Sequence, residues 1–326
     1  MNKIKWGIIG CGDVCEVKSG PAFSKIEHSE LVTVMRRNAE RAEDYAYRHQ
    51  VPVWYSDADD LINDPEVNAV YVATPPNSHL EYVLKVAQAG KPIYVEKPMG
   101  RTYAECQQMI EACEKAGVPL FVAYYRRQLP YFLKVKELIE SGIIGTITVV
   151  NLTLLKSPKI ADADPNLNWR VNPEISGGGH FHDLASHQLD LLAYYFGDFV
   201  DIVGIASNAL RQNAAEDTVT ASFKFESGLI GSGSWTFTSL ASHQKDQVQI
   251  IGDKGTITFC CFNDTTPIVL ETDSKRQEFS IPYPQHVQQP LIQTIVDELR
   301  GIGNCPSTGH TGAKANWVMD KVLGKI

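Results

Sequence analysis

The sequence predicts an α/β protein, with an N-terminal, doubly wound parallel sheet followed by an α+β domain that holds a large, mostly antiparallel, open sheet. Up to residue 124, short apolar runs alternate with amphipathic helical segments, which is typical of a parallel sheet covered by helices. Beyond it, strand-like segments follow one another through short glycine-containing turns, which indicates antiparallel pairing. We therefore expect two domains, residues 1–124 and residues 125–326.

The first domain is expected to hold six strands, at residues 3–9, 31–35, 51–54, 67–73, 93–95 and 120–123. The helices between them are expected at residues 39–49, 78–89 and 103–116, with others opening near residues 13 and 56. Asn77 is a candidate cap for the helix over 78–89. Thr102 and Glu105 have the spacing of a capping box for the helix over 103–116.

The second domain is expected to open with a helix over 130–141. Its strands are expected at residues 147–155, 200–207, 218–225, 229–237, 247–251 and 256–260. Helices near 286–300 and 309–323 finish the pattern, and either domain could receive the terminal one. Because one face of such a sheet lacks helices to cover it, we expect a homodimer or homotetramer formed through the C-terminal sheet.

Composition narrows the class of protein. The chain has 326 residues, of which 44% are hydrophobic and 21% charged, as in ordinary globular proteins. A net charge of -8 disfavours binding to nucleic acid or acidic membranes. No apolar run is long enough to span a bilayer, and the first residues lead into a strand without a leader, so a cytoplasmic location is expected. Seven cysteines without a CxxC pair indicate reduced thiols and no cysteine metal site.

A glycine-rich loop follows the first strand directly, as Gly10-Cys11-Gly12-Asp13-Val14-Cys15. The first glycine permits a tight turn, and the second allows backbone to approach a pyrophosphate. Cys15 replaces the usual third glycine, and its small side chain is compatible with close packing of helix on strand. The loop predicts a dinucleotide site in which helical N–H groups face the phosphates.

The end of the second strand favours one nucleotide over another. Arg36 and Arg37 stand where an NAD-binding chain would carry a carboxylate for the ribose 2′-hydroxyl. Two guanidinium groups suit a 2′-phosphate, so we predict NADP in preference to NAD. The alternative interpretation is a solvated basic turn into the next helix.

Glu96-Lys97-Pro98 follows the strand predicted over residues 93–95. In an open α/β sheet, ligands bind beyond the carboxyl ends of the strands. A lysine held there can exchange a proton with an alcohol or carbonyl oxygen. The alternative is an ordinary surface Glu-Lys pair before a turn, and the surrounding motifs favour the functional interpretation.

A second unusual stretch runs from residue 176 to residue 190, with three glycines followed by polar residues. The glycines predict a close backbone approach to a cofactor or to the first domain. Asp183, His187 and Asp190 have the i, i+4, i+7 spacing of one helical face, and His180 precedes them by one turn. Three interpretations compete: a capped helix N-terminus, a metal site, and a substrate-binding face. The absence of a zinc-type His-Glu-x-x-His pattern disfavours the metal site. We favour the third interpretation, because a catalytic-type lysine on the first of two domains needs a facing wall on the other.

Five motifs in this order resemble the family of glucose–fructose oxidoreductase, inositol dehydrogenase and MocA proteins (Gfo/Idh/MocA), which are NAD(P)-dependent sugar oxidoreductases. They are the glycine loop, residues 73–79, Glu96-Lys97-Pro98, Trp169-Arg170, and the triple glycine followed by Asp183-x-x-x-His187. The resemblance implies a Rossmann domain followed by an α/β domain. It implies a catalytic role for Lys97, Asp183 and His187. Cofactor contacts are implied for Gly10, Gly12, Asp13, Val14, Arg36, Arg37, Thr74, Pro75, Asn77, His79, Glu96, Lys97, Trp169 and Arg170.

Substrate contacts are expected from Lys97, Tyr125, His180, Asp183 and His187. The expected reaction is hydride transfer between a nicotinamide and a sugar hydroxyl or carbonyl, with Lys97 as general acid/base. Two alternatives are a nicotinamide-assisted lyase or glycosidase without net redox change, and a non-catalytic NADP-binding sensor. No metal is expected. The loop over 157–174, with Asp162, Asp164, Asn166 and Asn168, is expected to help select the sugar.

Overall fold

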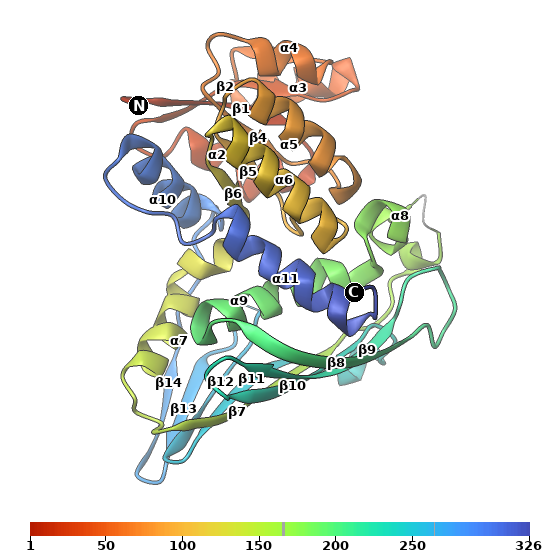
Figure 1. Ribbon diagram of the computed structural model, residues 1–326, viewed down its shortest axis with the longest axis vertical. Helices are drawn as coiled ribbons and strands as arrows, with labels where there is room; N and C mark the ends of the chain where they lie inside the picture. The colour runs from red at the N-terminus through yellow and green to blue at the C-terminus, as the bar shows by residue number, and fades with distance from the viewer. Residues whose placement is uncertain (165–166, 264) are drawn as a thin grey trace. The chain divides into compact units, whose positions relative to one another are not determined.

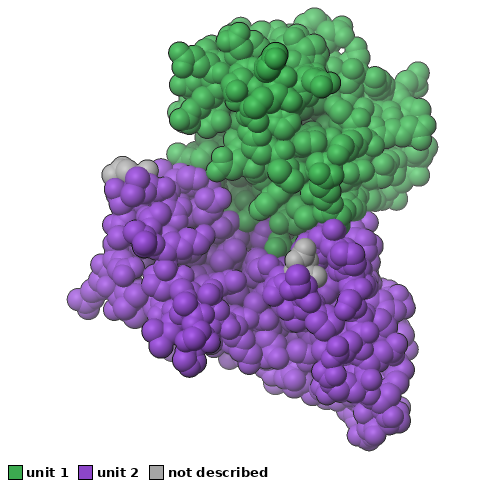
Figure 2. All heavy atoms as spheres, turned by 180° about the vertical axis from the view of Figure 1, so that it is seen from behind, with its two compact units in different colours: residues 1–127, 284–313 green, residues 128–283, 314–326 purple. Residues whose placement is uncertain are grey.

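The structure is a computed structural model that describes residues 1–164, 167–263 and 265–326 (Figure 1). Asn166, one of the loop residues expected to select substrate, lies outside the described residues. The chain divides into two compact units, which Figure 2 colours separately: residues 1–127 with 284–313, and residues 128–283 with 314–326. The predicted fold class is confirmed. The functional boundary after residue 124 stays a prediction.

The first unit is built on a six-stranded parallel sheet with the order β3-β2-β1-β4-β5-β6. The strands β4, β5 and β6 are buried at every residue, because helices cover both faces of such a sheet. The strands are β1 (Ile4–Ile9), β2 (Ser29–Met35), β3 (Val53–Tyr55), β4 (Ala69–Val72), β5 (Ile93–Val95) and β6 (Leu120–Val122).

Helices connect these strands, and α5 and α6 lie side by side against the sheet (Figure 1). They are α1 (Asp13–Val17), α2 (Gly20–Phe23), α3 (Ala39–His49), α4 (Ala58–Asn63), α5 (His79–Gln88) and α6 (Tyr103–Ala116). The helix α10 (Gln289–Arg300) also belongs to this unit, although it comes late in the sequence. The first five residues of α11 (Gly309–Val322) are assigned to the first unit and the rest to the second.

Helix starts show where local signals mislead. The prediction that Asn77 caps α5 is wrong, because residues Pro76–Ser78 form a 3₁₀ turn and α5 begins only at His79. The turn is closed by hydrogen bonds from the N–H and hydroxyl of Ser78 to the Pro75 carbonyl. The capping box of α6 is half formed: the Thr102 hydroxyl accepts from the N–H of Glu105 at 3.2 Å, but the Glu105 carboxylate turns to Arg101.

The second unit holds an eight-stranded sheet with the order β14-β13-β12-β11-β7-β10-β9-β8. All its neighbouring pairs are antiparallel except β7 with β10. The strands are β7 (Ile147–Leu155), β8 (Phe199–Ser207), β9 (Thr218–Phe225), β10 (Ile230–Thr236), β11 (Lys245–Gly252), β12 (Gly255–Phe259), β13 (Ile268–Thr272) and β14 (Lys275–Phe279). The last two were not predicted, because β14 is an exposed edge strand rich in charge and lacks apolar alternation.

Besides the later part of α11, the second unit holds the helices α7 (Pro130–Glu140), α8 (Pro173–Ser176) and α9 (Ser186–Phe196). The helix α9 packs on one face of the sheet, where the indole N–H of Trp235 donates to Gln188 Oε1 at 2.7 Å (Figure 1). Other side chains are exposed, including Val203 at 69% and Ile205 at 73% on β8. Across the described residues, no helix combines the length and apolarity that crossing a bilayer requires.

Candidate functional site

The glycine loop begins one residue after β1. Gly10 has a φ of +89°, and a Cβ atom there would lie 2.6 Å from Thr74 Cγ2. A Cβ at Gly12 would meet only the Gly10 carbonyl, at 3.9 Å, so the backbone faces open space there. No side chain caps α1, which starts at Asp13. The loop therefore fits a dinucleotide phosphate, because bare N–H groups at a helix start favour anions.

Cys15 takes the place of the usual third glycine and is fully buried. Burial raises the pKa of its thiol well above the ordinary value, so the group is neutral and acts in packing. Nearby, a Cβ at Gly20 would lie 2.3 Å from the Cys15 carbonyl oxygen. Gly20 therefore allows α2 to begin close against the backbone of α1, a contact that the sequence did not predict.

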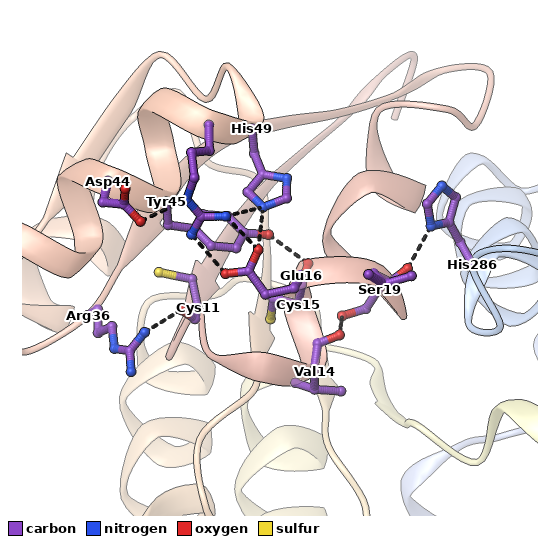
Figure 3. Close-up of polar contacts among 12 residues, drawn as sticks. Cys11, Val14, Cys15, Glu16, Ser19, Arg36, Asp44, Tyr45, His49 and His286 are labelled. Carbon is purple, nitrogen blue, oxygen red and sulfur yellow. Dashed lines mark hydrogen bonds and ion pairs between the residues drawn. The ribbon is translucent and has the colours of Figure 1, made fainter.

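An ion cluster not anticipated from the sequence connects α1 to the end of α3 (Figure 3). The Glu16 carboxylate accepts two hydrogen bonds from Arg48, at 2.7 and 2.9 Å, and lies 2.8 Å from His49 Nε2. Arg48 also donates to Asp44 at 2.8 Å. These hydrogen bonds, those from Arg48 first, lower the pKa of Glu16 from 4.5 to about 2. The cluster fixes the helix that follows the glycine loop.

This shift predicts an acid-sensitive contribution to folding. Because the pKa of Glu16 is lower in the folded chain, its stabilisation is full above pH 4.5 and is lost as the pH falls toward about 2. We expect Glu16→Gln to lower the thermal midpoint at neutral pH and to reduce its fall between those limits. Thermal denaturation followed by circular dichroism across that range measures both. Glu40→Gln, an exposed carboxylate in the first turn of α3, is the control and should reproduce the wild-type pH curve.

Arg36 and Arg37 follow β2. Arg36 is half-buried and its Nη1 donates to the Cys11 carbonyl at 3.4 Å, so the guanidinium lies beside the glycine loop (Figure 3). Arg37 is exposed. Asn38 caps α3 by accepting from the N–H of Arg41 at 2.9 Å. The arrangement places a cation at the end of β2 and fits an anionic group on the adenosine ribose.

The segment after β4 has different surroundings at each predicted residue. Thr74 and Pro75 are half-buried and Asn77 is exposed. His79 is fully buried, with Nε2 2.7 Å from the Thr74 carbonyl and Nδ1 3.1 Å from that of Met99. Burial lowers the pKa of His79, which favours the neutral ring. His79 therefore links the loop after β4 to the loop after β5.

Glu96 and Lys97 follow β5. Glu96 is buried, whereas Lys97 is half-buried. The backbone N–H of Lys97 donates to Glu96 Oε2 at 3.1 Å. The glutamate is therefore part of the interior and holds the backbone from which the lysine side chain extends. Tyr125, a predicted substrate contact, is also in the first unit and is 8% exposed, with Arg126 over its ring.

The polar stretch of the second unit contains a π-helical turn. Residues Phe181–Ala185 form this turn, and α9 begins at Ser186. Asp183 therefore lies in the π-turn, whereas His187 and Asp190 lie in the regular helix α9, and the prediction that the three share one face stays a prediction. His187 is 3% exposed and Asp190 is fully buried. Such turns occur frequently at functional sites.

Two predicted residues meet in this unit. Arg170 Nε lies 3.2 Å from Asp183 Oδ2, and the Arg170 guanidinium stacks over Trp169 at 4.5 Å from the ring centre. Trp169 and Arg170 belong to a loop that the resemblance associated with the cofactor. The Asp183 side chain is still 21% exposed, so the carboxylate keeps access to solvent.

His180 pairs with a residue from the loop over 157–174. Its Nε2 lies 2.9 Å from Asp162 Oδ2. Burial opposes the charge on Asp162, but hydrogen bonds from the Lys159 N–H, His180 and Asn168 outweigh it and lower the pKa of Asp162. Both side chains line a shallow pocket with Asn213. His180 is therefore oriented by this carboxylate.

The triple glycine lies close to side chains of its own unit, which the sequence did not predict. A Cβ at Gly178 would lie 2.3 Å from His182 Nδ1, and one at Gly179 would lie 2.6 Å from the Ala215 Cβ. His182 is fully buried, with Nδ1 3.1 Å from the Gly178 carbonyl. Burial, with Lys325 nearby, lowers the pKa of His182 to about 3, so its ring is neutral. His182 is part of the packing around the turn.

Two known families of protein domains match this chain, one in each half. Residues 4–124 match the oxidoreductase family with an NAD-binding Rossmann fold, and residues 132–258 match the GFO/IDH/MocA C-terminal domain. The chain belongs to the Gfo/Idh/MocA family of oxidoreductases. As a member of this family it is an NAD(P)-dependent enzyme.

Members of the Gfo/Idh/MocA family resemble this chain over most of its length. Oxidoreductase P35 of Formosa agariphila is 40% identical over 325 residues, 99% of each chain. Myo-inositol 2-dehydrogenase of Thermotoga maritima is 28% identical over 276 residues, 83% of this chain and 79% of the relative. A solved levoglucosan dehydrogenase in complex with NADH and levoglucosan superposes with a TM-score of 0.85 at 24% identity, covering 99% of this chain and 96% of that one, and shows the shared fold.

Metal chemistry was one of the three interpretations of the polar stretch. Within residues 1–164, 167–263 and 265–326, no three His, Cys, Asp or Glu side chains are grouped as a metal ion would require.

Proposed function

We propose that this enzyme transfers hydride between a nicotinamide dinucleotide and a hydroxyl or carbonyl carbon of a small sugar or sugar derivative, with Lys97 as general acid/base. One observation carries the proposal. Ile9 of β1, Val72 of β4 and Val95 of β5 are paired in register, so the strands end at the same level. Gly10 follows the first of these residues directly, and Lys97 comes two residues after the last. The glycine loop and the amine thus share the carboxyl edge of one sheet, where ligands bind in this architecture.

The bound nicotinamide supplies or accepts the hydride. In the reducing direction, the Lys97 ammonium donates a proton to the substrate oxygen as negative charge develops on it. We assign His187 as a hydrogen-bond donor to the substrate oxygen, and Asp183 as the group that orients His187 or a substrate hydroxyl. The contact between Asp183 and Arg170 holds this carboxylate in place, which suits an orienting role.

The substrate class is supported by two relatives, whose names specify myo-inositol and levoglucosan. The direct test incubates the purified enzyme with NADPH or NADP⁺ and a panel of aldoses, ketoses, cyclitols, anhydro sugars and sugar acids. Absorbance of the reduced nicotinamide should change with at least one of them. A sugar cleaved with no net change in the nucleotide would support the lyase or glycosidase alternative. If no sugar is altered and the dinucleotide changes binding of another protein, the sensor alternative stands.

We propose NADP as the preferred nucleotide, with Arg36 and Arg37 binding the adenosine end. Arg36→Asp should weaken NADPH binding by at least about tenfold, because it replaces an attractive charge with a repulsive one, and should improve binding of NADH. Fluorescence titration with both nucleotides measures this ratio. Arg41→Asp, on the exposed face of α3, changes the charge equally and is the control. A wild type that binds NADH more tightly than NADPH would contradict the proposal.

The assembly belongs to the same proposal. The exposed valine and isoleucine side chains on β8 support a homodimer or homotetramer that forms through the second sheet. A cytoplasmic location is proposed on the composition of the chain.

A further inference from the structure

A buried polar cluster surrounds Glu96 in the first unit. It consists of Tyr71 on β4, Tyr94 on β5, Glu96 just after β5, and Gln288 just before α10. Gln288 is fully buried and Glu96 is 7% exposed. We call these four residues the Glu96 cluster. No feature of the sequence points to Gln288, which is nearly two hundred residues from Glu96 in the chain.

The hydrogen-bond donors of the cluster all point, directly or through Gln288, toward Glu96. Tyr94 donates from its hydroxyl to Gln288 Oε1 at 2.7 Å. The amide is thereby oriented so that its Nε2 donates to Glu96 Oε1 at 2.6 Å. Tyr71 donates its hydroxyl to the same oxygen at 2.5 Å. Burial, followed by the charge of Glu96, raises the pKa of both tyrosines well above the ordinary value, so they are neutral donors.

The second oxygen of Glu96 connects this cluster to Lys97. Glu96 Oε2 accepts the backbone N–H of Lys97 at 3.1 Å, so this carboxylate helps to hold the lysine backbone in place. A buried carboxylate needs all its hydrogen-bond donors, since a buried carboxylate oxygen without a donor costs much more free energy than the loss of a surface hydrogen bond. Loss of the Gln288 amide would therefore allow the Glu96 carboxylate to rotate, and would release the Lys97 backbone.

The segment that carries Gln288 also contacts the helix of the glycine loop. The N–H of Gln288 donates to the Lys18 carbonyl at 3.1 Å, and His286 Nδ1 lies 2.6 Å from the Val17 carbonyl (Figure 3). One short segment thus holds both the end of α1 and the end of β5. These are the two elements that the proposed function assigns to the dinucleotide and to proton transfer.

We propose that Gln288 is a positioning residue for Lys97, acting through the Glu96 carboxylate that it binds. The proposal rests on the proposed role of Lys97. The four residues of the Glu96 cluster are separate from those assigned to the substrate. Charged and titratable groups that influence Glu96 or are influenced by it are Tyr71, Tyr94, Cys15, His79 and Lys97.

The test compares two replacements of similar size. Gln288→Met removes the donor at every pH, and kcat should fall roughly tenfold or more while the KM for the nucleotide changes little. Gln288→Glu places two carboxyl groups together, which share a proton only when the pH is low enough. Its kcat should therefore recover toward the wild-type value as the pH is lowered from about 8 to about 6, whereas the Gln288→Met profile stays parallel to the wild type.

Gln293→Met is the matched control, because Gln293 lies on α10 and donates to Asp297 without facing Glu96. It should keep wild-type kcat. Equal kcat in Gln288→Met and wild type would overturn the proposal, as would identical pH profiles for the two Gln288 variants or a loss of nucleotide affinity that matches the loss of kcat. If Lys97→Met itself retains turnover, the proposed function fails, and that result is distinct from a negative result at Gln288 alone.

Discussion

Lys97→Met is expected to reduce kcat by about a hundredfold or more while leaving the dissociation constant of the dinucleotide within about threefold of wild type. Methionine keeps the length and the apolar stem of lysine but carries no proton to transfer. The side chain is half-buried, so loss of its charge should not destabilise the sheet. Steady-state kinetics with the best sugar of the panel, together with fluorescence titration of NADPH, measure the two effects separately.

Lys85→Met is the matched control for this experiment. Lys85 lies on α5 and pairs with Asp59 at the surface, away from the carboxyl edge of the sheet. Its replacement should leave kcat unchanged. If Lys97→Met and Lys85→Met give the same kcat as the wild type, then Lys97 has no part in proton transfer and the assignment of the reaction must be revised.

Gly10→Ala is expected to weaken dinucleotide binding by at least tenfold, or about 1.4 kcal/mol in binding free energy. The residue has a φ of +89°, a region that L-residues adopt at a cost of about 1–2 kcal/mol. The new Cβ would also lie 2.6 Å from Thr74 Cγ2 and 3.1 Å from the Thr74 backbone nitrogen. The ends of β1 and β4 would have to separate, and both flank the loop proposed to hold the pyrophosphate.

Gly90→Ala separates these two causes. Gly90 also has a positive φ, of +69°, but a Cβ there would have no atom within 4 Å. This variant should lower the thermal midpoint through backbone strain alone and should bind NADPH as the wild type does. Calorimetry of binding and thermal denaturation of both variants complete the comparison. An unchanged NADPH affinity in Gly10→Ala would show that the loop tolerates a side chain and does not contact the phosphates closely.

Local patterns were sufficient to predict the fold class and the principal elements of both units. The glycine turn after β1 and the strand before Glu96 were both readable, because a buried parallel strand is a continuous apolar run and a tight turn needs glycine. The helix α3 was predicted with its observed bounds. These features depend on residues that are neighbours in sequence, so each can be predicted from a single stretch of the chain.

Other features depended on contacts between distant segments. Gly178 lies against the His182 ring, and Asp183 pairs with Arg170. No local sequence pattern predicts either contact. The sequence by itself determined which strands and turns hold the candidate residues, because strand and turn preferences are local. Only the tertiary structure decided that Gln288 holds Glu96, because satisfying a buried carboxylate depends on whichever donor the fold brings within reach.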